Sequence, residues 1–89
     1  MARFTVLVTQ EIEVELDEAQ FTEEFMEEFR ASFFGYSTIE EHAEHIAQLQ
    51  ARGIIDLEGR ATEFVEGYGP SEEMGINTRI LDFTTEVLQ

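Results

Sequence analysis

The sequence of 89 residues contains no cysteine, no lysine and no tryptophan, and only one proline. Without cysteine the chain forms no disulfide, offers no thiolate to a metal ion and has no cysteine nucleophile, so nothing argues for an oxidising compartment. It shows no N-terminal export signal and no run of 18 apolar residues. We therefore expect a cytoplasmic protein with no membrane partner, stabilised by packing alone.

Positive charge is also scarce: twenty Asp and Glu stand against five Arg, and the formal net charge is −15. Five dispersed Arg cannot neutralise a track of phosphates, so direct nucleic-acid binding is disfavoured, whereas a basic protein surface would attract this chain. Acidity that only confers solubility stays open as an alternative. Adaptation to salt is less favoured, because 17 of the 20 acids are Glu and a salt-adapted surface would use Asp freely.

Apolar residues are plentiful enough for one folded domain. The hydrophobic fraction is 43 %, with eight Phe and two Tyr, well above that of a disordered acidic tail. A chain of this length buries roughly 60 to 65 % of its unfolded surface. We expect residues 1–89 to form a single acidic domain.

Residues 3–16 alternate apolar and polar side chains with period two, which predicts a long strand. Only Gln10 interrupts the even-numbered apolar row, and we expect a bulge near it. The odd-numbered side ends in a row of carboxylates at Glu11, Glu13 and Glu15. The strand therefore has one apolar side and one acidic end.

Two amphipathic helices are predicted next. Thr22 is the expected N-cap of a helix that runs to about residue 34 and is stopped by Gly35. One face of this helix carries Phe25, Met26, Phe29 and Phe33, and the other carries Glu23, Glu24, Glu27 and Glu28. Thr38 and Glu41 form a T-x-x-E capping box for a second helix, which should end at Arg52-Gly53 because glycine readily adopts the left-handed conformation.

The remaining sequence predicts two strands, at about 61–68 and 76–88, separated by turns rich in glycine. The predicted order is β-α-α-β-β. We expect an α+β, two-layer sandwich in which two helices cover one face of a three-stranded, at least partly antiparallel sheet, against the even-numbered side of the first strand.

Two histidines are the only candidates for metal chemistry. His42 and His45 lie three apart with Glu41 and Glu44 beside them, but one helix supplies at most two well-aimed ligands and no third ligand motif is evident. A catalytic acid also needs a desolvated pocket, and a chain this short must use most of its apolar residues in one core. We expect no metal, no cofactor and no catalytic residue; a metal-dependent enzyme remains a minor alternative that metal content would test.

The acidic rows are the best candidate for a binding surface. Carboxylates two apart on a strand lie about 6.7 Å apart, and helical pairs about 5 to 6 Å, comparable with two rises of about 3.4 Å along a nucleic-acid strand. Glutamates at helix starts and on solvated faces are also ordinary, but that interpretation leaves the near absence of basic residues at i+4 unexplained. Phe34, Tyr36 and Tyr68 are the aromatics hardest to place in the core, and they either complete the core edge or anchor a partner. The predicted partner-binding residues are Glu11, Glu13, Glu15, Glu23, Glu24, Glu27, Glu28, Tyr36, Glu40, Glu41, Glu44 and Tyr68.

In its small size, its acidic faces between Glu11 and Glu44 and its lack of Lys and Cys, the chain resembles the acidic anti-defence proteins of phages and mobile elements, the anti-CRISPR and anti-restriction inhibitors. Those inhibitors share no single fold, so no residue role is carried over. The resemblance implies an inhibitor, not an enzyme, that mimics nucleic acid and occupies the basic site of a nucleic-acid-binding protein or ribonucleoprotein complex in the host bacterial cytoplasm. The alternative is a small adaptor or homodimeric module that uses Tyr36 and Tyr68, with acidity only for solubility.

Overall fold

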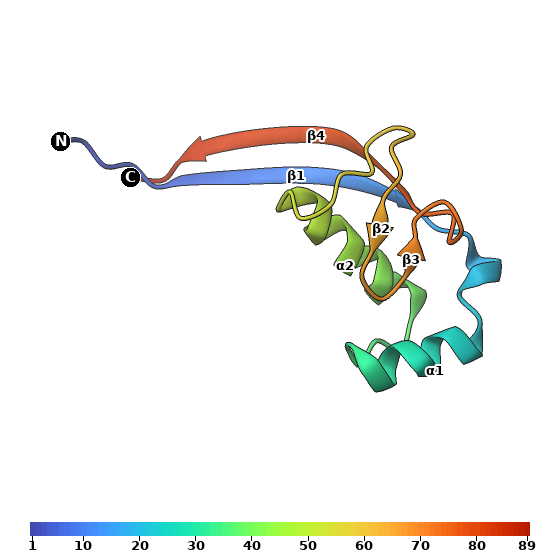
Figure 1. The fold of residues 1–89 in the computed structure, drawn as a ribbon. Coiled ribbons are helices and arrows are strands. Elements are labelled where there is room, and N and C mark those ends of the chain that lie inside the picture. Colours follow the sequence, from blue (N-terminus) through green and yellow to red (C-terminus); the bar gives the residue numbers. More distant parts are fainter.

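The computed structural model describes residues 1–89 and has an α+β fold, as predicted, made of a long two-stranded ribbon and a body that carries the helices (Figure 1). The molecule is elongated, with extents of 53 × 27 × 19 Å. No helix has both the length and the apolar character needed to cross a bilayer. The elements are β1 (Val6–Glu15), a 3-10 turn η1 (Glu18–Gln20), α1 (Glu23–Ser32), α2 (Ile39–Ala51), β2 (Phe64–Val65), β3 (Gly69–Pro70) and β4 (Asn77–Val87).

The strands form two separate antiparallel sheets, so the prediction of one three-stranded sheet is wrong. β1 pairs with β4, and β2 pairs with β3. The strand expected at 61–68 shrinks to Phe64–Val65, because the chain reverses directly after it: the amide of Tyr68 donates to the carbonyl of Val65, and Gly67 and Gly69 have φ of +91° and +81°. Alternation alone did not reveal this tight hairpin.

The β1–β4 ladder contains one bulge. Its register shifts between Glu11 and Ile12, whose partners are Asp82 and Ile80, so Leu81 has no opposite residue. The bulge predicted near Gln10 therefore lies one residue further along, and the extra residue belongs to the other strand. Bulges increase the local twist of a ribbon.

Only the half of the ribbon next to the body is covered. Val14 and Leu16 pack against the core, whereas Val6 and Val8 are 47 % and 51 % exposed. In Figure 1, α2 lies beneath the part of the ribbon nearest the body, and the other half projects away from both helices. The expected burial of the whole even-numbered row is therefore wrong: the helices are too short to cover a strand of ten residues.

Both helix starts agree with the prediction. The hydroxyl of Thr22 accepts from the amide of Phe25 at 3.1 Å, and the hydroxyl of Thr38 accepts from the amide of Glu41 at 3.2 Å. The second helix ends in a Schellman motif at Gly53, φ +73°, in which the amide of Ile54 donates to the carbonyl of Leu49. The first helix ends at Ser32, two residues before the expected end.

The core lies inside the body, around Phe29 on α1. Gly67 is required there, because a Cβ at this position would lie 2.7 Å from Cε2 of Phe29. The residues of the core are Phe29, Ile46, Ile55, Leu57, Val65, Tyr68, Met74 and Ile76. The core thus draws on α1, α2, the short hairpin and the turn before β4, while the free half of the ribbon contributes nothing to it.

Candidate partner-binding surface

The outer face of α1 carries four exposed carboxylates. Its inner face is fixed by Phe29, which is 2 % exposed, so the glutamates at the other positions of the 3.6-residue repeat must face solvent. Arg30 donates to the carbonyl of Tyr36 at 3.3 Å and lies within 4.0 Å of no carboxylate. The four are Glu23, Glu24, Glu27 and Glu28.

The carboxylates of α2 divide into two roles. Glu40 and Glu44 are exposed, as the predicted surface requires. Glu41 is half-buried and belongs to the helix cap, where its Oε1 accepts from the amide of Ser37 at 3.1 Å and from the hydroxyl of Thr38 at 3.3 Å. Glu41 is therefore less available to a partner than the sequence suggested.

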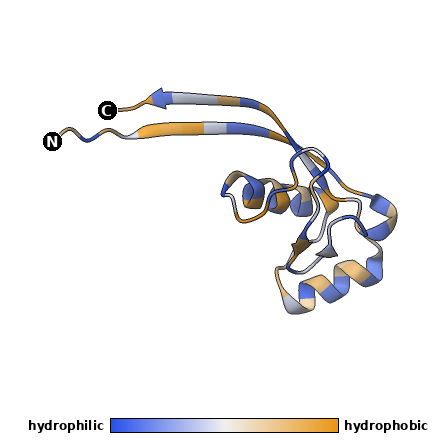
Figure 2. Ribbon diagram, turned by 45° about the horizontal axis from the view of Figure 1, so that its top comes forward, coloured by the Kyte–Doolittle hydropathy of each residue, from blue (hydrophilic) through white to orange (hydrophobic).

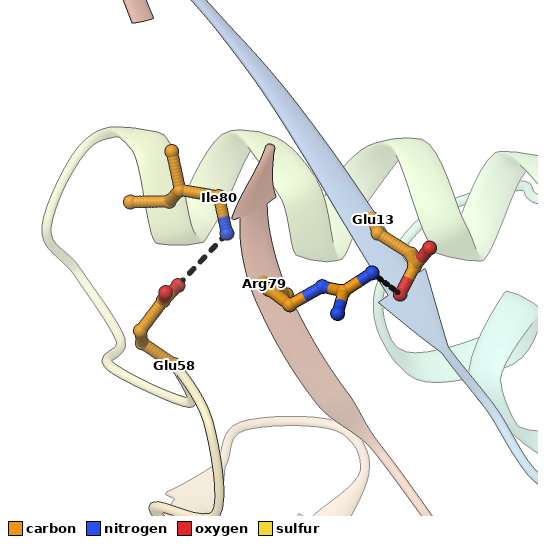
Figure 3. Close-up of polar contacts among 4 residues, drawn as sticks. All are labelled: Glu13, Glu58, Arg79 and Ile80. Atoms are coloured by element: carbon orange, nitrogen blue, oxygen red, sulfur yellow. Dashed lines mark hydrogen bonds and ion pairs between the residues drawn. The ribbon is translucent and has the colours of Figure 1, made fainter. Parts of the chain in front are cut away.

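The carboxylates at the end of β1 are partly neutralised. Glu13 of β1 forms an ion pair with Arg79 of β4 at 3.4 Å (Figure 3). Glu13 and Glu15 also line an open polar hollow that includes Arg60 and Arg79. Nearby, the carboxylate of Glu58 accepts from the amide of Ile80 at 3.0 Å, so this acid closes the edge of β4 (Figure 3). The strand end is a mixed surface, whereas the exposed acids of α1 and α2 have no ion-pair partner.

That ion pair is the only one in the molecule, and its side chains are 63 % and 43 % exposed. Exposed pairs of this kind contribute little to stability, about 0 to 1 kcal/mol. Nineteen of the twenty acids, that is 20 minus 1, have no cationic partner within the chain. The negative charge of this surface is therefore not neutralised by ion pairs within the chain.

Tyr68 is not a surface anchor, which corrects one of the predicted binding residues. It is 5 % exposed, and its hydroxyl is joined to Nδ1 of His42 by a hydrogen bond of 2.8 Å. Burial raises the pKa of its phenol well above the usual value. Tyr36 is half-buried, stacks on Phe29 and Phe34, and its hydroxyl contacts Nδ1 of His45 at 3.2 Å.

Both histidines pack among aromatic rings, with His42 inside the body and His45 half-buried beside Tyr36. His42 is fully buried, its Nε2 has no hydrogen-bond partner, and its ring meets Phe29 edge-on at 4.7 Å between centroids. Burial lowers the pKa of His42, with a smaller contribution from nearby His45, and burial also lowers the pKa of His45. The structure groups no three His, Asp or Glu side chains where they could hold a metal ion.

An apolar hollow of about 260 Å³ opens between the C-terminal ends of the two helices and β2. Phe33 and Phe34 at its rim are 44 % and 51 % exposed. The sequence placed Phe33 on the buried face of α1; it became exposed because the helix ends at Ser32. Phe34 was the detectable signal, since it follows the last apolar position of the helix and had no place in the core.

Searches with this chain found no matching protein-family model, no matching curated protein and no matching solved structure.

Proposed function

We propose that the chain is a stoichiometric protein inhibitor whose acidic helical surface binds the basic, nucleic-acid-binding surface of a host defence complex, by mimicry of the anti-CRISPR or anti-restriction kind. One observation carries the proposal: six exposed carboxylates on α1 and α2 have no cationic side chain within 4.0 Å. They are Glu23, Glu24, Glu27, Glu28, Glu40 and Glu44.

The six carboxylates need positive charge from outside the chain to be neutralised. Solvated helix faces commonly carry Arg or Lys at i+3 or i+4 from Glu, yet the only such residue on α1 and α2 is Arg30, which donates to the carbonyl of Tyr36 rather than to a carboxylate. The acids remain unpaired, which stores self-repulsion that a basic surface would relieve. A protein cleft built to hold phosphates presents the Lys and Arg needed, and attraction of this type raises the association rate steeply at low salt.

The test is capture of a partner from bacterial lysate by the immobilised chain, at low and at high salt. We expect a nucleic-acid-binding protein or complex that is retained at low salt, released at high salt, and displaced by its own nucleic acid. Charge reversal by Glu24→Lys with Glu28→Lys should reduce capture at least about tenfold, because close charge pairs contribute upwards of about 1.5 kcal/mol.

The matched control reverses two exposed acids elsewhere, Glu72→Lys with Glu73→Lys, and so makes the same change in net charge. Equal loss of capture in both double variants would mean that total charge, and not the helical surface, attracts the partner. A partner retained equally at low and high salt would refute the electrostatic account.

A second candidate function is a small adaptor that binds through aromatic surface. The exposed Phe33 and Phe34 beside the apolar hollow favour it, with half-buried Tyr36 behind them. Its partner would be insensitive to salt, and Phe34→Ala would weaken capture more than reversal of Glu24 and Glu28 does.

A further inference from the structure

The free half of the β1–β4 ribbon lacks a covering layer. Val6, Val8, Phe83 and Val87 are between 47 % and 63 % exposed, and Figure 2 shows apolar stretches running along the projecting part of β1. An isolated two-stranded ribbon is marginally stable in water, and three or more strands or a packed helix are needed. Near the body α2 provides that layer, where Ile12 is half-buried; further out nothing does.

One side of this ribbon carries no charge. Residues directly opposite each other on paired strands share a side, so the register assigns every paired ribbon residue to one side or the other, and only Leu81, at the bulge, has no opposite residue. The uncharged side, called the neutral face below, consists of Val6, Val8, Gln10, Ile12, Val14, Thr78, Ile80, Phe83, Thr85 and Val87. The charged residues Glu11, Glu13, Glu15, Arg79, Asp82 and Glu86 all lie on the opposite side. The neutral face therefore offers nothing to a cationic partner.

We propose that the free half of the neutral face packs against the same face of a second copy of this chain, related by a twofold axis and running in the opposite direction. A face without charge is compatible with itself, which is what a twofold interface requires. Two ribbons stacked in this way form two packed layers of two strands each. Each ribbon then buries the exposed apolar side chains of the other.

Charge selects the antiparallel arrangement. Each copy carries −15, and a parallel arrangement would bring two acidic bodies side by side. In the antiparallel arrangement the bodies lie at opposite ends, separated by the overlap of the two free halves. Five residues of strand, Val6–Gln10, span about 17 Å, which exceeds the Debye length of about 8 Å at physiological salt. The bodies then repel each other only weakly.

The shape of the molecule leaves room for this partner. α2 ends beneath the middle of the ribbon (Figure 1), and Ile54, just beyond that end, is 60 % exposed. The tip of the second ribbon would meet this end and continue the layer that the helix begins. The overlap is short and the buried area therefore small, so we expect a reversible dimer whose population depends on concentration.

The experiment is sedimentation equilibrium of the purified chain over a range of concentrations, at physiological and at high salt. We expect a monomer–dimer equilibrium that shifts toward the dimer as salt rises, because screening reduces the repulsion between the bodies. Binding of a basic partner through the acidic helices would have the opposite salt dependence, so failure of one proposal is distinguishable from failure of the other.

Two matched variants locate the interface. Thr84 and Thr85 are neighbours on β4, both exposed, and they face opposite sides of the ribbon. Thr85→Glu places an unpaired charge in the interface and should raise the dimer dissociation constant at least about tenfold, whereas Thr84→Glu should leave it within about twofold. Both variants should keep the circular dichroism spectrum of the parent.

A chain that sediments as a monomer at every concentration would overturn the proposal. Equal effects of Thr84→Glu and Thr85→Glu, or a dimer that weakens as salt rises, would do the same.

Discussion

His42 is a titratable side chain enclosed by aromatic rings. Its Nδ1 is bonded to Tyr68, its Nε2 has no partner, and no part of it reaches solvent. Burial lowers its pKa from 6.5, His45 and Arg30 act in the same direction, and only Glu41 opposes them. The folded state therefore favours the neutral imidazole, and a proton taken up at this position would be buried without a counterion.

This makes stability sensitive to mild acid. Below the unfolded pKa of 6.5 the unfolded chain binds a proton that the folded chain does not, so the free energy of unfolding should fall as the pH drops from 6.5 toward the lowered folded pKa. Urea midpoints at about pH 7.5 and about pH 5.5 measure this. His42→Gln should have a flatter profile between these values, and its slope gives the background from the carboxylates and His45. A parent slope no steeper than that of the variant would contradict the prediction.

The burial of Tyr68 could not be predicted from the neighbouring residues in the sequence. The sequence left open whether Tyr68 completes the core edge or anchors a partner, and it gave no sign that the partner of the hydroxyl is His42, 26 positions earlier in the chain. A polar atom that is satisfied by a distant residue leaves no local signal. The glutamates of α1 could be placed because the helical repeat alone decides which side they face.

At the scale of elements, the helix ends were predictable because capping is local. Thr38 and Glu41 are three residues apart, and Gly53 takes the left-handed conformation expected of it. Strand pairing was not predictable in this way. The alternation in β1 indicates which side is apolar, but not that α2 covers only the part near the body or that β2 pairs with β3 alone.

The cap of α2 gives a second stability prediction. Thr38→Ala removes the acceptor for the amide of Glu41 and a donor to its carboxylate, and it should lower the free energy of unfolding by about 1 kcal/mol. Chemical denaturation checks this. Ser37→Ala is the control and should change stability by less than about 0.5 kcal/mol, because Ser37 contributes only its backbone amide to the cap. Equal losses in the two variants would argue against the capping box.

The whole molecule combines a charge of −15 with a single ion pair. Repulsion among the acids opposes compactness, and added salt screens it. We expect sodium chloride to raise the free energy of unfolding by about 1 kcal/mol, equivalent to roughly 4 to 8 °C in melting temperature for a domain of this size.

This measurement should use the Thr85→Glu background, in which dimerisation makes no contribution. Glu24→Gln with Glu28→Gln removes two negative charges from the surface of α1. Salt should therefore raise the free energy of unfolding of this double variant by less than it raises that of Thr85→Glu alone. A salt response that is unchanged by this pair would mean that the repulsion lies elsewhere.

The extra residue Leu81 has a consequence for which deletions the chain could tolerate. If Leu81 were lost, the ladder would become regular and every remaining cross-strand partner would be kept, from Glu11 with Asp82 to Val6 with Val87. If one residue were lost between 83 and 85, the β4 side chains beyond that point would change sides, and Glu86 would move onto the neutral face opposite Val8. The site of a deletion, rather than its size, would then decide whether the projecting arm keeps one uncharged side.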